Sequence, residues 1–84
     1  MRLNTEFFGN VVSKYGEHSI YSEKMDLNIS ISNSLGQVLM ENQINGEKGS
    51  NRINFDASKY SNGLHFLEVL VDGKSIIRKF IVQH

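Results

Sequence analysis

The chain has 84 residues, of which 39% are hydrophobic and 21% charged, a balance typical of a folded globular domain. Nine Lys and Arg residues offset nine Asp and Glu residues, so the formal net charge is +0. This balance argues against a nucleic-acid-binding protein and against a polybasic membrane-surface module, since both usually carry a basic excess. No cysteine occurs, which excludes disulfides, cysteine nucleophiles and thiolate zinc sites.

We expect residues 1–84 to form a single domain with a thin core, because a chain this short buries only about 60–65% of the surface that its unfolded form exposes. No apolar run approaches the ~20 residues of a membrane-spanning helix. Residues 1–6 lack the apolar centre of a signal peptide. The protein is therefore either cytoplasmic or a piece of a longer precursor with its signal upstream, and the resemblance described below favours the precursor.

The first 24 residues carry the weakest pattern. Phe7-Phe8 and Val11-Val12 predict one short strand, and Ser19–Tyr21 predicts another. We expect Gly9 and Gly16 to interrupt these strands.

Residues 25–32 alternate strictly between apolar and polar side chains. Such alternation predicts a half-buried strand of an antiparallel sheet. A turn is expected at residues 33–36, with Gly36 free to adopt positive φ. The returning strand covers residues 37–44 and is expected to place Val38, Met40 and Ile44 on one face.

Residues 45–50 read as a polar loop, too rich in turn residues to lie inside an element. Residues 51–56 alternate again, with Ile53 and Phe55 expected to point inward. Residues 64–71 are apolar on both faces except for His65 and Glu68, which predicts a strand in the middle of a sheet.

Asp72-Gly73 then links this strand to residues 74–82 as a two-residue hairpin. Six or seven short strands with frequent turn signals predict an all-β, Ig-like sandwich of two antiparallel sheets.

Catalytic chemistry is not expected. Ser, His and Asp all occur, but there is no Gly-x-Ser-x-Gly elbow and no histidine in a catalytic context. His18, His65 and His84 are scattered, and Asp56 suits a turn-stabilising role better than a calcium site, so neither a metal nor a cofactor is predicted. His65 shares a face with apolar residues and is interpreted either as a buried, hydrogen-bonded imidazole or as a pH-sensitive packing position.

Aromatic side chains offer a second possible function. They could form a stacking platform for sugar, although such residues more often belong to a core and no tryptophan is present. The aromatic residues concerned are Phe7, Phe8, Tyr15, Tyr21 and Tyr60.

The last third of the chain contains turn and strand residues in a characteristic order. Asp56, Ser58 and Tyr60 precede Asn62-Gly63; then follow Leu67, Val69, Asp72-Gly73-Lys74, Lys79 and Val82. Earlier, residues 29–39 run through an apolar strand into a Leu-Gly turn at Gly36. In this order, these features resemble the C-terminal sorting domain of the type IX (Por) secretion system of Bacteroidetes. The resemblance covers residues 25–82. Two departures are the missing Pro-Asn-Pro opening, whose nearest counterpart is residues 9–13, and His65 in place of the usual tyrosine.

The resemblance implies a non-catalytic sorting domain that directs an exported cargo protein through the periplasm and the type IX apparatus to the cell surface or the medium. The implied partners are an outer-membrane shuttle and a surface sortase, with no nucleic acid. Recognition of the folded domain would use exposed backbone and side chains of a terminal strand, such as residues 74–82, with strand addition to its edge as one route. The signature residues are Gly36, Asp56, Tyr60, Gly63, Asp72, Gly73, Lys74, Lys79 and Val82. A carbohydrate-binding or fibronectin-III-like adhesive module remains the alternative, since the architecture alone does not separate the two. A weak edge-strand dimer also stays open.

Overall fold

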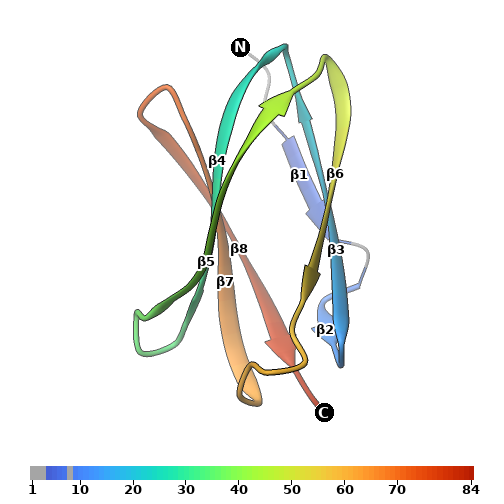
Figure 1. The fold of residues 1–84 in the computed structure, drawn as a ribbon, viewed down its shortest axis with the longest axis vertical. Helices are drawn as coiled ribbons and strands as arrows, with labels where there is room; N and C mark the ends of the chain where they lie inside the picture. Colours follow the sequence, from blue (N-terminus) through green and yellow to red (C-terminus); the bar gives the residue numbers. More distant parts are fainter. Residues whose placement is uncertain (1–3, 8) are drawn as a thin grey trace.

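The computed structural model describes residues 4–7 and 9–84, which form eight strands. They are β1 (Asn4–Phe7), β2 (Val11–Val12), β3 (Tyr15–Ser22), β4 (Met25–Asn33), β5 (Val38–Gly46), β6 (Gly49–Asp56), β7 (Gly63–Val71) and β8 (Lys74–Val82). Three strands pair in the order β1-β3-β6 and five in the order β2-β8-β7-β4-β5. The sheets face each other as two layers, which confirms the predicted all-β sandwich (Figure 1). It has eight strands instead of six or seven, and one strand pair, β2 with β8, is parallel. None of the described residues forms a helix able to cross a membrane.

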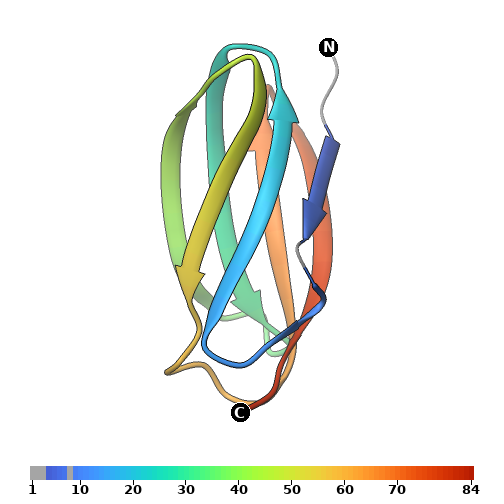
Figure 2. The same cartoon turned by 90° about the vertical axis from the view of Figure 1, so that its right-hand side faces the viewer.

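The N-terminal segment differs from the prediction of one short strand. Phe7 belongs to β1, which pairs antiparallel with β3, whereas Val12 belongs to β2, which pairs in parallel with the end of β8. Gly9 has φ +91, a backbone conformation that breaks an extended run. The chain crosses here from one sheet to the other (Figure 2). The strand position predicted for Phe8 lies outside the described residues.

The prediction that Gly16 interrupts a strand was wrong, because β3 extends from Tyr15 to Ser22. Gly16 pairs with Phe55 of β6, and a Cβ atom at Gly16 would overlap the ring of Phe55. The glycine therefore provides room for an aromatic ring within a regular strand.

The hairpin from β4 to β5 follows the prediction with one correction. Gly36 has φ +83, and the Asn33 Oδ1 atom accepts hydrogen bonds from the backbone N–H groups of Leu35 and Gln37 at 3.0 Å each. A bulge next to Ile31 places Val38 opposite Ser32, on the outer face, while Met40 lies opposite Ile31. Val38 is therefore exposed and does not share the inner face with Met40.

The polar loop predicted over residues 45–50 shortens to Glu47-Lys48, because β5 runs through Gly46 and β6 begins at Gly49. The Asn51 side chain makes the tight connection possible. Its Oδ1 atom accepts from the Glu47 N–H at 2.7 Å, and its Nδ2 group donates to the Glu47 carbonyl at 3.0 Å and to the Ile20 carbonyl at 3.2 Å. This amide supplies hydrogen bonds that a longer loop would otherwise need from water.

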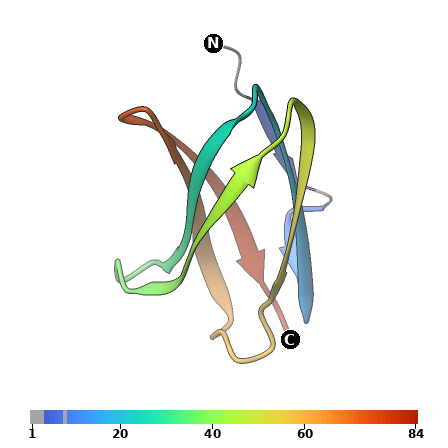
Figure 3. The same ribbon diagram turned by 45° about the horizontal axis from the view of Figure 1, so that its top comes forward.

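The terminal hairpin matches its prediction. β7 lies between β8 and β4, and Asp72 and Gly73 have φ 49 and φ 74. Positive φ at both central positions is the signature of a type I′ turn, whose twist suits a hairpin. Figures 1 and 3 show that this turn stands apart from the three-stranded sheet.

The core lies between the two layers. It is built by the inward-facing side chains of both sheets, namely Val12, Ile20, Leu27, Ile29, Ile31, Ile53, Phe55, Ala57, Leu67, Val69, Val71, Phe80 and Val82. Phe80 joins the layers, with its ring centroid 5.3 Å from those of both Phe7 and Phe55.

Candidate recognition surface on the terminal hairpin

The outer face of the five-stranded sheet carries an exposed apolar patch. β7 and β8 alternate so that one set of side chains enters the core and the other points away from it. In register, Leu64 lies opposite Ile81, and Ile81 lies beside Val11 of β2, which makes an aliphatic row across three strands. We call the outward-facing apolar side chains of β2, β7 and β8 the outer patch: Val11, Leu64, Phe66, Leu70, Ile77 and Ile81. Val11 is 60% exposed and Ile77 53%.

Such a patch is informative because exposed apolar surface often marks an interaction site. Glu68, opposite Ile77, and Lys79, opposite Phe66, divide it into two parts. The sequence correctly indicated that residues 64–71 are apolar on both faces and central in a sheet. The prediction did not anticipate that the second face stays uncovered. The sequence signal for this exposed face was the alternation of side chains along the strand, which in β8 places Ile77 and Ile81 on the outer face.

Two lysines lie on the hairpin that carries the outer patch. Lys79 lies opposite Phe66 on the outer face, whereas Lys74 begins β8 opposite the buried Val71 and points to the other face. In the part of the chain that the structure describes, neither lysine has a carboxylate within ion-pair distance; the salt bridge present joins Arg52 Nε and Glu17 Oε1 at 3.2 Å. Both lysine ammonium groups are thus available to a partner.

The remaining signature residues do not converge on one pocket. Asp72, Gly73 and Lys74 form the hairpin turn at one end of β7 and β8. Gly63, with φ +129, begins β7 opposite Val82 at the other end (Figure 1). Gly36 lies in the β4–β5 turn.

Two signature residues, Asp56 and Tyr60, make side-chain contacts in the segment between β6 and β7. The Asp56 carboxylate accepts a hydrogen bond from the Ser58 N–H at 2.9 Å. Hydrogen bonding from the side chain of Ser58, and then from this N–H, lowers the pKa of Asp56. The Tyr60 ring stacks on His65 with centroids 5.6 Å apart, and burial together with nearby Asp56 raises the pKa of Tyr60. The predicted Asx role of Asp56 is therefore present.

The C-terminal residue closes this end of the sandwich. The His84 N–H donates to Asn62 Oδ1 at 2.8 Å, and its ring Nε2 lies 2.7 Å from the Tyr60 carbonyl oxygen. The end of β8 and the β6–β7 segment consequently form one hydrogen-bonded unit.

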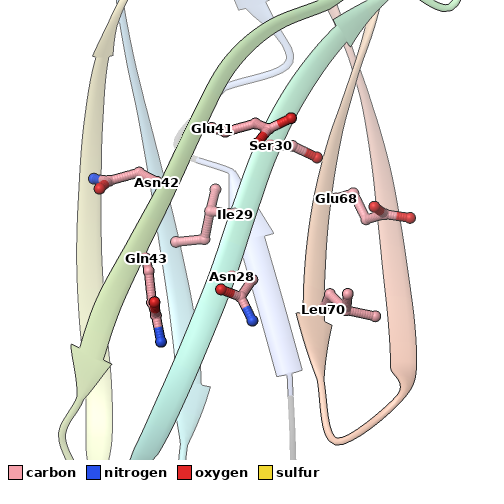
Figure 4. A pocket seen from close by; sticks show the side chains of 8 residues that line it. All are labelled: Asn28, Ile29, Ser30, Glu41, Asn42, Gln43, Glu68 and Leu70. Atoms are coloured by element: carbon pink, nitrogen blue, oxygen red, sulfur yellow. The ribbon is translucent and has the colours of Figure 1, made fainter.

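A shallow groove of about 530 Å³ lies on the outer face over β4, β5 and β7 (Figure 4). Ser30 lies in register between Glu41 and Glu68, and Glu68 accepts a hydrogen bond from Ser75 Oγ at 2.7 Å. The groove is lined by Asn28, Ile29, Ser30, Glu41, Asn42, Gln43, Glu68 and Leu70. Aromatic residues are absent from this lining, so it provides no stacking surface for sugar.

The aromatic residues considered for a sugar platform are divided between core and surface. Phe7 packs into the core, with its ring centroid 4.1 Å from the ring centroid of His18. The Tyr60 ring stacks on the His65 ring. Tyr15 and Tyr21 are exposed on β3, six positions and therefore about 20 Å apart. Phe8 lies outside the described residues.

Two histidines are buried among the aromatic rings of the core. His65, expected to face inward, is buried, and its Nδ1 lies 3.0 Å from the Gly63 carbonyl oxygen, while Nε2 has no partner in the part of the chain that the structure describes. His18 is fully buried, and neither of its ring nitrogens has a partner among the described residues. Burial, with a smaller contribution from the nearby Arg78 guanidinium, lowers the pKa of His18 to about 4. The sequence prediction missed His18 because the strand was placed too short to include it.

Within residues 4–7 and 9–84, no three side chains of the metal-binding types gather. The arrangement thus offers a docking surface made of apolar side chains, lysines and a rigid turn.

Comparison with known proteins identifies the family. The family model described as a secretion system C-terminal sorting domain matches residues 10–83, which include every strand except β1. None of the curated proteins compared matches the chain. Because the match covers almost the whole sandwich and agrees with the turn and strand signature of its last third, the chain belongs to the C-terminal sorting domains of the type IX secretion system.

Proposed function

We propose that this domain directs an exported cargo protein across the outer membrane through the type IX apparatus, and that the terminal hairpin β7–β8 is the surface that the apparatus recognises. Membership of the sorting-domain family supports a secretion-signal role and delivery to the cell surface or the medium. Transit through the periplasm and contact with an outer-membrane shuttle and a surface sortase are the finer parts of the proposal.

The observation that carries the proposal is the combination of Lys74, Lys79 and the outer patch on one exposed hairpin. In this proposal, Asp72, Gly73 and Gly63 set the backbone geometry of the hairpin, and Val82 anchors its last strand in the core. Lys74 and Lys79 contact the apparatus directly. No catalytic residue is needed, because domains of this family are generally non-catalytic.

The experiment uses a fluorescent reporter that carries an export signal and this domain at its C-terminus. It is expressed in a type IX-competent bacterium and in the same strain without the translocon. We expect fluorescence outside the cells only in the type IX-competent strain. Equal release from both strains, or retention in both, would contradict the proposal.

Deletion of residues 74–84 is a poor test of recognition, since it removes Phe80 and Val82 from the core. A charge reversal at both Lys74 and Lys79 leaves the core intact. The matched control reverses two other exposed lysines, Lys24 and Lys48. We expect the first variant to lower export by roughly tenfold, as loss of one or two charge-assisted contacts would do, with export of the control almost unchanged.

A further inference from the structure

The edge of β8 that faces away from β7 is only partly occupied. At its C-terminal end, the Ile81 N–H donates to the Asn10 carbonyl at 2.8 Å, and the Gln83 N–H donates to the Val12 carbonyl at 2.9 Å. The N–H groups of Ile81 and Gln83 therefore point away from β7. In an antiparallel pair these directions alternate from residue to residue, so the N–H and C=O groups of Ser75, Ile77 and Lys79 point the same way.

No described strand pairs with this part of the edge. β2 ends its contact with β8 at Ile81, because the chain turns at Gly9 and crosses to β1 in the other sheet. Figure 2 shows β1 and β8 at the same side of the sandwich but in different layers. The free stretch from Lys74 to Lys79 is about 20 Å long, enough for an added strand of ordinary length.

Natural sheets usually blunt such an edge with proline, a bulge or a short strand. β8 is nine residues long, pairs with β7 without a register shift, and contains no proline. Its protection consists of charge alone, from Lys74, Arg78 and Lys79. All three charges are positive, and β8 contains no acidic residue.

The side chains along this edge define the chemistry of what can pair with it. Ile77 and Lys79 point to the outer face, where Ile81 and Val11 continue the apolar row. A strand added here would place alternate side chains beside Ile77 and Lys79 on that same face. Aliphatic groups suit this face, and carboxylates suit the other face, to which Lys74 and Arg78 point.

We propose that the Lys74–Lys79 edge of β8 accepts an extended partner segment in which acidic and aliphatic side chains alternate, as an additional strand in line with β2. The inference rests on the proposed function in one respect, since the secretion apparatus is the partner expected to supply that segment. Backbone hydrogen bonds would hold the segment once the Arg78 guanidinium, which donates to the Ile77 carbonyl at 3.3 Å, moves away from that carbonyl. The cations of the edge would select for the carboxylates of the segment.

The test is a titration of the isotopically labelled 84-residue domain, followed by amide NMR. The probe is a capped peptide of about eight residues, a typical strand length, in which valine alternates with glutamate. A second peptide has lysine in place of glutamate. We expect the glutamate peptide to shift the amides of Ser75, Ile77 and Lys79 and to slow their exchange with solvent, and the lysine peptide to have no such effect. Unperturbed amides at millimolar glutamate peptide, or equal binding of both peptides, would overturn the proposal.

Ile77→Pro separates strand addition from simple charge attraction, because it removes one outward N–H and keeps all three cations. Proline is tolerated where an edge N–H faces solvent. The matched control is Gln43→Pro on β5. The same alternation, carried across β7 and β4, points the Gln43 N–H out of the opposite edge of the sheet. We expect Ile77→Pro to weaken peptide binding by about tenfold and Gln43→Pro to leave it unchanged. Thermal unfolding verifies that both variants fold.

Two further outcomes identify a different partner or a separate failure. In the first, the domain binds phosphatidylglycerol vesicles but not the glutamate peptide, and Ile77→Pro leaves vesicle binding unchanged. That outcome would point to an anionic lipid surface and overturn strand addition. Because the titration uses the domain alone, its result does not depend on export. If the domain binds the peptide through this edge but does not export a reporter, the result would contradict the proposed function. The edge would still be a peptide-binding site.

Discussion

His18 is a buried histidine whose two ring nitrogens have no hydrogen-bond partner among residues 4–7 and 9–84, so folding removes it from water without compensation from these residues. This cost is smallest when the ring is neutral, and burial accordingly lowers the pKa of His18 from 6.5 to about 4. The unfolded chain therefore binds a proton between these two pH values that the folded domain does not bind.

The first prediction concerns acid stability. Because the pKa of His18 is lower in the folded state, its contribution to stability is fully present above pH 6.5 and is lost as the pH falls toward 4. The loss amounts to about 3 kcal/mol across that range. Urea unfolding at several pH values measures it, and His18→Phe provides the control because it keeps an aromatic ring beside Phe7. An equal pH dependence in both proteins would show that His18 is not responsible.

The second prediction concerns Gly16, which faces the ring of Phe55. Gly16→Ala should destabilise the domain by about 1–3 kcal/mol, since the added methyl group overlaps that ring. The double variant Gly16→Ala/Phe55→Leu should recover part of the loss, because a smaller side chain leaves room for the methyl group. A double-mutant cycle from urea unfolding measures this coupling. Strict additivity of the two changes would contradict the packing explanation.

Among the strands, β1 is the one outside the residues that the family model matches. It nevertheless pairs with β3 over four residues and contributes Phe7, whose ring lies 4.1 Å from His18 and 5.3 Å from Phe80. β1 thus covers the buried histidine and completes one side of the sandwich.

The third prediction follows from this contact. Phe7→Ala should destabilise the domain by about 2–3 kcal/mol, somewhat less than loss of a fully buried phenylalanine, because Phe7 is only partly buried. It should also raise the pKa of His18 toward its ordinary value, since water gains access to the ring. NMR titration of the histidine ring protons measures the second effect, with Glu6→Ala, an exposed neighbour, as the control. A pKa of His18 unchanged by Phe7→Ala would indicate that other groups exclude water from it.

The fourth prediction separates the two turn glycines. Gly73→Ala and Gly36→Ala each place a side chain at positive φ, and each should cost about 1–2 kcal/mol. The two turns differ in location: Gly73 belongs to the proposed recognition hairpin and Gly36 to the β4–β5 hairpin. If hairpin geometry matters for sorting, Gly73→Ala should lower reporter export more than Gly36→Ala at equal stability. Equal export by both variants would assign the two glycines a purely structural role.

On the scale of the whole molecule, the domain depends on one thin core. An 84-residue domain has a stability of about 4–13 kcal/mol. Phe80, 1% exposed and in contact with Phe7, Phe55 and His65, bridges both layers of that core.

The fifth prediction is that sorting requires the folded sandwich. Phe80→Ala should remove about 3–5 kcal/mol, a large share of the total stability. Protease resistance and export of the reporter should then be lost together. An unfolded, protease-sensitive variant that is still exported would show that the signal is read as a linear sequence.

Local side-chain patterns, namely alternation, apolar runs and turn residues, made much of the fold predictable. β4, β6, β7 and the type I′ turn at Asp72-Gly73 follow directly from the pattern of side chains. The errors occurred where a contact distant in sequence overrides a local signal. By its residue type, Gly16 predicts a break in the strand, but in the fold the Phe55 ring occupies the space where a side chain would lie. By their composition, residues 45–50 predict a loop, but in the fold the Asn51 amide closes a two-residue turn.

By itself, the sequence determined the all-β class, the terminal hairpin and the resemblance to type IX sorting domains, since these depend on local periodicity, turn residues and their order. Only the tertiary structure decided that Phe7 and Val12 lie in different sheets. Only it decided that, among the described residues, His18 is buried without a partner and part of the β8 edge has no neighbouring strand beside an exposed apolar patch. These features arise from pairing between segments far apart along the chain. A side-chain pattern specifies which faces of a strand are apolar, but which face is covered depends on the strands that pack against it.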